Sequence, residues 1–232
     1  WNIHHHGLEV LEWAFNILKE KGFAPDSEFN IKNLVEEKGR IRMVLPKTTN
    51  YQIRLVLREG DLLSELNKEV KHGEFDIAIM GSPRRKRMTN KISQFLDTSI
   101  FFVKNFNPNW NYKILLCVDD SRATKRAVIL STRISKQFDA EIISLTVSKT
   151  SFFGKGYRNA HTWAERYLKR MGILFDSKLL SGNPVDVFVD EAGEDHIIIM
   201  GKAKGNEILK FIFGSKPIHT AQCSNCPVLM VN

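Results

Sequence analysis

A glycine-containing stretch near the end of the chain is the segment whose residue types best suit the binding of an anion. Gly201 ends a run of apolar residues, Lys204-Gly205 follow it closely, and Gly214-Ser215 stand further on. Glycines after a strand let backbone amides approach a phosphate, and the amides of a helix N-terminus favour a negative charge. The hydroxyl of Ser215 would add a donor. The spacing therefore predicts a phosphate site, although tight strand-to-helix turns that bind nothing would give the same glycines.

Charged residues near this stretch could complete such a site. Lys202, Lys204 and Lys216 would add positive charge around a phosphate. The pair Asp119-Asp120 follows an apolar run and could hold Mg²⁺ beside phosphates, or could simply cap the next helix. We find no pairing of nucleophile and base and no pair of carboxylates with a recognisable spacing. We therefore name no catalytic residue, and any ATP hydrolysis would be slow.

Cys223 and Cys226 have the spacing of half a zinc site, but no second pair exists in the sequence. A structural role for these cysteines is the better interpretation, and we predict no metal site. The third cysteine, Cys117, lies in an apolar run. A small odd number of cysteines does not suggest a disulfide framework and favours a reducing compartment, so we expect a cytoplasmic protein.

The elements that must position these residues alternate between strand and helix. Buried strands give continuous apolar runs, and helices give apolar residues every three or four positions. Alternation of this kind predicts a mainly parallel sheet, which binds ligands outside the carboxyl ends of its strands. In the second half of the chain we predict strands at Ile114–Val118, Glu141–Val147 and Leu174–Leu180, helices at Arg122–Phe138 and His161–Met171, and a loop at Ser151–Arg158.

The sequence contains an internal repeat. Ile77-Ala78-Ile79-Met80-Gly81 recurs as Ile197-Ile198-Ile199-Met200-Gly201, and similar segments flank both copies in the same order. We predict an α/β fold with two tandem, open, mainly parallel sheets flanked by helices. The predicted domains are 1–108 and 109–232, joined by an Asn-rich linker at Asn105–Asn111.

The second half resembles the universal stress protein family, which has an adenine-nucleotide alpha-hydrolase-like fold. Nucleotide-binding members have a glycine, two residues, a second glycine, nine residues and then Gly-Ser or Gly-Thr. Gly201 and Gly214-Ser215 match this pattern, while Lys204 takes the place of the second glycine and Gly205 comes one position late. The resemblance implies that Asp119 contacts the adenosine end of a nucleotide and that Val147 contacts adenine. It also implies ATP, with Mg²⁺, as the cofactor, and an internal pseudo-dimer or a homodimer that pairs through last strands near Phe101 and Leu229.

The first half departs further from the family pattern. The position that matches Gly214 is Gln94, and Pro83 removes an amide donor, so we expect no ATP there. The run Arg84–Arg87 could bind an acidic partner or a membrane surface, or could be a solvated loop. A strand should precede the helix expected at Leu8–Lys21, and its absence leads us to expect a piece of a longer chain.

The net charge of +8 favours an anionic partner, and no apolar run is long enough to span a bilayer. Two functions remain open. One is a stress-response or regulatory module that binds an adenine nucleotide in its second half. The other is a cytosolic regulatory domain of a membrane transporter that binds no nucleotide, because tails of cation–chloride cotransporters and some antiporters share the fold. Nucleic-acid binding rests on charge alone, and from the sequence we do not expect it.

Overall fold

The computed structural model describes residues 2–37, 39–46, 52–82, 86–202 and 216–232. The chain divides into two compact units, Trp1–Glu65 and Leu66–Asn232. The division falls inside helix α2 (Leu62–Gly73). Within the described ranges, no helix is both long and apolar enough to cross a membrane.

The first unit is a helix packed on a small sheet. Helix α1 (Asn2–Glu20) is followed by the short 3-10 helix η1 (Ile31–Asn33) and by strands β1 (Val35–Glu37), β2 (Arg40–Val44) and β3 (Arg54–Arg58). The strands pair in the order β1-β2-β3, and both pairs are antiparallel. Phe15, Met43 and Leu45 form its core, each no more than 3% exposed. The apolar patterns of Arg40–Leu45 and Gln52–Leu57 predict β2 and β3, but β1 was not predicted, and the expectation of a mainly parallel sheet is wrong for this unit.

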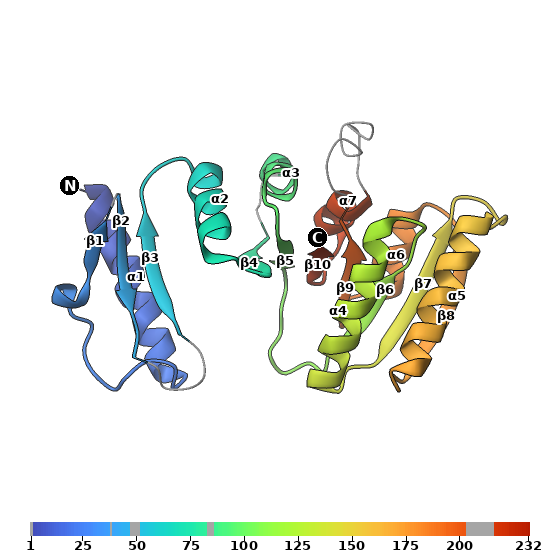
Figure 1. Cartoon of the computed structure of the whole chain (residues 1–232), viewed down its shortest axis with the longest axis horizontal. Coiled ribbons are helices and arrows are strands. Elements are labelled where there is room, and N and C mark those ends of the chain that lie inside the picture. Colours follow the sequence, from blue (N-terminus) through green and yellow to red (C-terminus); the bar gives the residue numbers. More distant parts are fainter. Residues whose placement is uncertain (1, 38, 47–51, 83–85, 203–215) are drawn as a thin grey trace. The chain divides into compact units, whose positions relative to one another are not determined.

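The second unit is built on a seven-stranded sheet with the order β4-β5-β10-β9-β6-β7-β8 (Figure 1). Every neighbouring pair is parallel except β5 and β10. The strands are β4 (Ile77–Gly81), β5 (Ser99–Val103), β6 (Lys113–Cys117), β7 (Ile142–Ser148), β8 (Phe175–Ser181), β9 (His196–Gly201) and β10 (Val228–Val231). The helices that begin after α2 are α3 (Lys86–Phe95), α4 (Arg122–Phe138), α5 (Lys155–Arg170), α6 (Pro184–Ala192) and α7 (Lys216–Cys223). The predicted α/β architecture with a mainly parallel sheet is confirmed in this unit.

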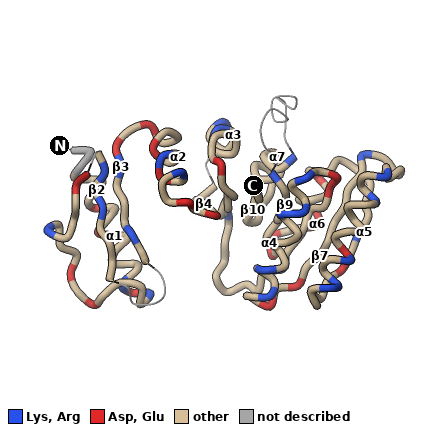
Figure 2. The backbone as a smooth tube through the Cα atoms, in the orientation of Figure 1, with Lys and Arg blue, Asp and Glu red and all other residues tan. Residues whose placement is uncertain are grey.

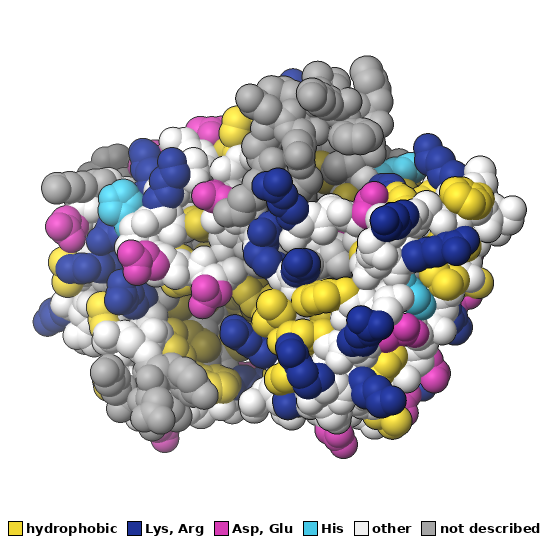
Figure 3. All heavy atoms as spheres, turned by 45° about the vertical axis from the view of Figure 1, so that its right-hand side comes forward, with side chains coloured by type: hydrophobic (Ala, Val, Ile, Leu, Met, Phe, Trp, Pro, Cys, Tyr) yellow, Lys and Arg dark blue, Asp and Glu magenta, His cyan; other side chains and the backbone are white. Residues whose placement is uncertain are grey.

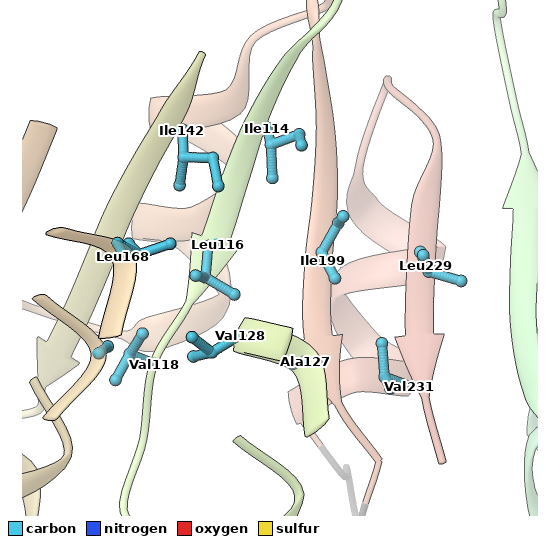
Figure 4. Close-up of a cluster of buried hydrophobic side chains, with 11 residues drawn as sticks. Ile114, Leu116, Val118, Ala127, Val128, Ile142, Leu168, Ile199, Leu229 and Val231 are labelled. Atoms are coloured by element: carbon cyan, nitrogen blue, oxygen red, sulfur yellow. The ribbon is translucent and has the colours of Figure 1, made fainter. Parts of the chain in front are cut away.

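One core cluster of this unit lies between the sheet and the layer formed by α4 and α5. Strands β6, β7, β9 and β10 send apolar side chains towards these helices, as Figure 4 shows for Ile114, Leu116, Ile199 and Leu229. Both helices are amphipathic. For example, Ala127 and Val128 on α4 are fully buried, while the preceding residue Arg126 is exposed. Helix α4 has the bounds that the sequence predicted, whereas α5 begins at Lys155, inside the predicted loop.

Two strand pairs within the large sheet repeat each other. Gly81 at the end of β4 lies opposite Val103 on β5, and Gly201 at the end of β9 lies opposite Val231 on β10. The residue after each glycine donates its amide to the carbonyl of that valine, at 2.9 Å in the first pair and 2.7 Å in the second. The last strands of the two pairs meet antiparallel, with Phe101 opposite Leu229. One sheet therefore crosses the predicted boundary at residue 108, and the division into tandem copies remains a prediction.

Candidate functional site

The order of the strands creates a natural binding point at the carboxyl end of β6. From β6 the chain moves outward through β7 and β8, and then returns to the other side of β6 to form β9 and β10. The connections after β6 and β9 therefore leave in opposite directions. Parallel sheets bind ligands at such switch points, because the diverging loops leave a crevice between them.

Residues at these strand ends line a small cavity. Its walls come from the ends of β6, β7 and β9, from α6 and from the start of α7. The cavity has a volume of about 20 Å³, with a wider mouth open to solvent, so it holds little more than one water molecule in this conformation. The lining residues are Cys117, Val118, Asp119, Val147, Phe188, Met200, Gly201, Lys216 and Pro217.

Asp119, which lines the cavity, is held by hydrogen bonds to the start of α4. Its Oδ1 accepts a hydrogen bond from the Thr124 hydroxyl at 2.6 Å and another from the Ser121 amide at 3.0 Å. Ser121 is the N-cap residue of α4, so the carboxylate supports the turn into that helix. None of the described residues donates a hydrogen bond to Oδ2. That oxygen can accept one from a ligand hydroxyl without disturbing the turn.

Gly201 is required by packing. A Cβ atom at this position would lie 2.6 Å from the backbone carbon of Ala123 and 2.8 Å from the amide nitrogen of Thr124. These are backbone atoms in the first turn of α4, which cannot move aside as the end of a flexible side chain could. The glycine therefore allows β9 to lie against α4, whether or not it also brings amides near a phosphate.

The two described lysines that were expected to face a phosphate behave differently. Lys202 is 7% exposed, and its ammonium donates to the carbonyl of Leu96 at 2.5 Å, so its predicted role at the site is wrong. Lys216 lines the cavity. Its Nζ lies 3.3 Å from the hydroxyl of Tyr157 and 5.7 Å from the centre of that ring. Lys216 is therefore the cation in place to meet an anion at this site.

Comparisons with known proteins agree with this architecture. No protein-family model and no curated protein sequence matches the chain. Among solved structures, a universal stress protein from Archaeoglobus fulgidus DSM 4304 superposes with a TM-score of 0.60 at 17% identity, over 76% of this chain and 67% of that one. The chain has the universal stress protein fold. A putative universal stress protein from Pseudomonas aeruginosa UCBPP-PA14 gives a TM-score of 0.53 at 15% identity, over 75% of this chain and 69% of that one.

A shorter match covers about half of this chain. The universal stress protein from Archaeoglobus fulgidus in complex with dAMP is 18% identical, with a TM-score of 0.41, and covers 52% of this chain and 98% of that one.

Three of the seven residues predicted from the stress-protein motif lie together at the cavity. Asp119, Val147 and Gly201 all line it, although the sequence places them on three separate strand ends. The other four, Lys204, Gly205, Gly214 and Ser215, lie outside the described residues, as do Arg84 and Arg85 of the basic run.

Sequence reasoning missed two aromatic residues of the site. Phe188 lies on α6, where its apolar character indicates a buried helix face but not a cavity. Tyr157, which positions Lys216, falls in the segment predicted as a loop. The apolar spacing of α5 extends back to Tyr157 and could have revealed this error.

The cysteines of this stress-protein fold sit in unlike environments. Cys117 lines the cavity but is buried, and burial raises the pKa of its thiol well above the ordinary value, with the nearby Asp119 carboxylate acting in the same direction. Burial likewise raises the pKa of Cys226, while Cys223 is exposed. Within the parts of the chain that the structure covers, no three His, Cys, Asp or Glu side chains gather as a metal site requires.

Proposed function

We propose that the protein is a regulatory module that binds an adenine nucleotide at the carboxyl ends of β6, β7 and β9. The observation that carries this proposal is that Asp119, Val147, Gly201 and Lys216 meet at one cavity at the switch point of the sheet. Asp119 would accept a hydrogen bond from a ribose hydroxyl through Oδ2. Val147, Phe188 and Met200 would form apolar contacts with adenine, and Lys216 would pair with phosphate.

The size of the cavity requires a change of side chains on binding. A space of about 20 Å³ does not admit an adenine ring. The contact between Lys216 and Tyr157 is long for a hydrogen bond and partly exposed, so it can be exchanged for a phosphate at little cost. We therefore expect binding to displace Lys216 from Tyr157.

Native mass spectrometry of the full chain, with and without ATP and Mg²⁺, tests the proposal. We expect a one-to-one complex with ATP. Lys216→Gln should raise the dissociation constant of this complex about ten- to a hundredfold, because a charged hydrogen bond contributes about 1.5–3 kcal/mol. The matched substitution Lys202→Gln should leave the affinity unchanged, because the Lys202 ammonium contacts the carbonyl of Leu96.

Two results would contradict this assignment. One is no complex at saturating ATP. The other is equal weakening by both lysine substitutions in variants that melt like the parent chain, because the loss would then not come from the contact of Lys216 with phosphate. Thermal melting of both variants separates loss of folding from loss of the Lys216 contact.

A second function is favoured by the packing at Gly201 and by the burial of Lys202. The packing explanation for Gly201 and the inward direction of Lys202 both remove support for a phosphate loop. They fit a regulatory domain that keeps the fold and binds no nucleotide, such as a cytosolic domain of a membrane transporter. Absence of binding to ATP, ADP and AMP, in a chain that melts cooperatively, is the result that would select this alternative.

A further inference from the structure

Helices α4 and α5 carry charges of almost one sign. Together they contain ten Lys and Arg residues and one acidic residue, Glu165. The net charge of the whole chain is +8, so the other residues together are close to neutral. The cations are Arg122, Lys125, Arg126, Arg133 and Lys136 on α4, and Lys155, Arg158, Arg166, Lys169 and Arg170 on α5.

All ten cations are exposed, and they form two parallel rows on one surface, which we call the α4–α5 face. On α4 they recur at spacings of three, four or seven residues and on α5 at three, four or eight, which places them within one outward stripe on each helix. The two helices lie side by side, since Lys125 of α4 lies 5.5 Å from the ring centre of Trp163 on α5. Figure 2 shows the blue segments along both helices, and Figure 3 shows dark-blue side chains gathered over this part of the molecule.

At the start of both helices this arrangement works against helix stability, although Lys136, Lys169 and Arg170 are favourably placed in the last turns. Neither helix has an acidic residue in its first turn, where Arg122 and Lys155 stand, although the helix dipole favours negative charge there. Like charges also face each other one turn apart, as at Arg122 and Arg126. The one carboxylate of the two helices, Glu165, lies 3.4 Å from the ring nitrogen Nε2 of His161. A surface needed for solubility alone would mix the two signs.

We propose that the α4–α5 face binds the phosphate backbone of a nucleic acid duplex without reading its sequence. The α4 row runs from Arg122 to Lys136, about 21 Å at the helical rise. A duplex carries about 12 phosphate charges over that length. Six of the ten cations are arginines, whose planar guanidinium groups suit bidentate contacts with phosphate. This surface is separate from the cavity at Asp119, and the proposal does not depend on nucleotide binding there.

The aromatic residues of the face favour a duplex over a single strand. Trp163 and Tyr167 stack on each other with ring centres 5.4 Å apart. Lys125 lies over Trp163, and Arg170 lies over Tyr167 at 5.4 Å. Unpaired bases need open aromatic rings on which to stack, and these rings are engaged. They instead hold two of the cations in place.

The apolar content of the face argues against a membrane. A helix surface that docks on lipid buries large apolar side chains beside its cations. On α4 and α5, the exposed large apolar residue that the structure describes is Phe138, the last residue of α4. Just before α5, Phe152 is also exposed, and its ring centre lies 5.8 Å from the Arg158 guanidinium. Beside ten cations, these two rings are a small apolar surface, which suits a soluble polyanion better than lipid.

Fluorescence anisotropy with a labelled mixed-sequence duplex of about 20 base pairs tests the proposal on the full chain. We expect binding at about 50 mM salt that weakens at least a hundredfold by about 200 mM salt, as for proteins that make several phosphate contacts. Arg133→Gln combined with Arg166→Gln should weaken binding about tenfold and reduce the salt slope by about two. These two arginines occupy equivalent positions on α4 and α5, eleven residues from the start of each helix and away from the cavity.

The matched control is Lys32→Gln combined with Lys71→Gln, which removes the same charge from exposed positions outside the face. It should change affinity less than threefold, and both double variants should melt like the parent chain. The proposal is overturned if the duplex does not bind at low salt, or if the two double variants bind equally well. Binding to phosphatidylserine vesicles without binding to the duplex would also overturn it, since the face would then belong to a membrane.

Discussion

Strands β4 and β9 share almost the same five residues but lie in different surroundings. Ile79 in β4 is 69% exposed, whereas the equivalent Ile199 in β9 is fully buried. β9 lies between β10 and β6 and under α4, while β4 pairs with β5 and ends the order of the sheet. Their glycines differ in the same way. A Cβ atom on Gly81 would meet nothing within 4 Å, and one on Gly201 would strike the backbone of α4.

The contrast shows that one sequence pattern can serve two physical roles. An apolar strand that ends in glycine predicts a buried parallel strand, but its place in the sheet decides how much each residue contributes to stability. Gly201, which resembles part of a phosphate loop, is needed at the end of β9 for packing against α4. The equivalent Gly81 at the end of β4 has no such constraint. Substitutions at matched positions in the two strands can measure this difference directly.

The largest difference is expected at the two isoleucines. Ile199→Ala should lower the free energy of unfolding by about 2–5 kcal/mol, because it removes a fully buried side chain and leaves a cavity beside Leu116 and Leu229. Ile79→Ala should change it by about 0.5 kcal/mol or less, as for exposed positions. Urea unfolding of both variants, followed by circular dichroism, measures the two values. Equal losses would show that β4 is covered by another part of the protein.

A smaller difference is expected at the two glycines. Gly201→Ala should cost about 1–3 kcal/mol, because the added methyl group forces β9 and the start of α4 apart. Gly81→Ala should be neutral or should stabilise by up to about 1 kcal/mol, since it restricts the unfolded chain and meets nothing in the folded one.

Thermal melting of these glycine variants provides the measurement. If Gly201→Ala melts like the parent chain, the close approach to Ala123 is not a constraint. The glycine would then have to be explained by ligand binding.

The order of strands and helices could be predicted because buried strands and amphipathic helices each have a periodicity that local sequence displays. Asp119, Val147 and Gly201 were expected at one site from the resemblance to the stress-protein family, and their meeting agrees with the rule that parallel strands end at one edge of the sheet. The direction of Lys202 could not be predicted, because it depends on the carbonyl of Leu96, about a hundred residues away in the chain. The antiparallel pairing of β2 and β3 was not predicted either, although the nine residues between Val44 and Arg54 are too few for a parallel crossover.

The α4–α5 face was also only partly predictable from the sequence. Its ten residues are visible in the sequence at helical spacing, but the sequence does not show that α4 and α5 lie side by side. The rings of Trp163 and Tyr167 are partly buried and pack against the core of the unit. The contact of Lys125 with Trp163 shows that the two rows of charge belong to one surface.

The smallest predicted effect concerns Cys117, whose strand β6 pairs with β9 at Met200. Because burial raises the pKa of this thiol, it stays protonated in the folded chain at a pH where the unfolded chain loses the proton, above about 8.5. The unfolded state then binds fewer protons than the folded state, so stability falls as pH rises from that point. One such group contributes a slope of up to about 1.4 kcal/mol per pH unit.

Cys117→Ala should therefore make the loss of stability between about pH 8.5 and pH 10 less steep, with Cys223→Ala as the control at an exposed thiol. The pKa of the Cys226 thiol is also raised, and Cys226 is present in both variants. Part of the decrease in stability with pH should therefore persist in each variant. Urea unfolding at several pH values gives the slopes. If the two variants lose stability equally with pH, then water reaches Cys117 through the cavity beside Asp119. In that case the strands around β9 are more open than their burial indicates, and a nucleotide could enter without displacing Lys216.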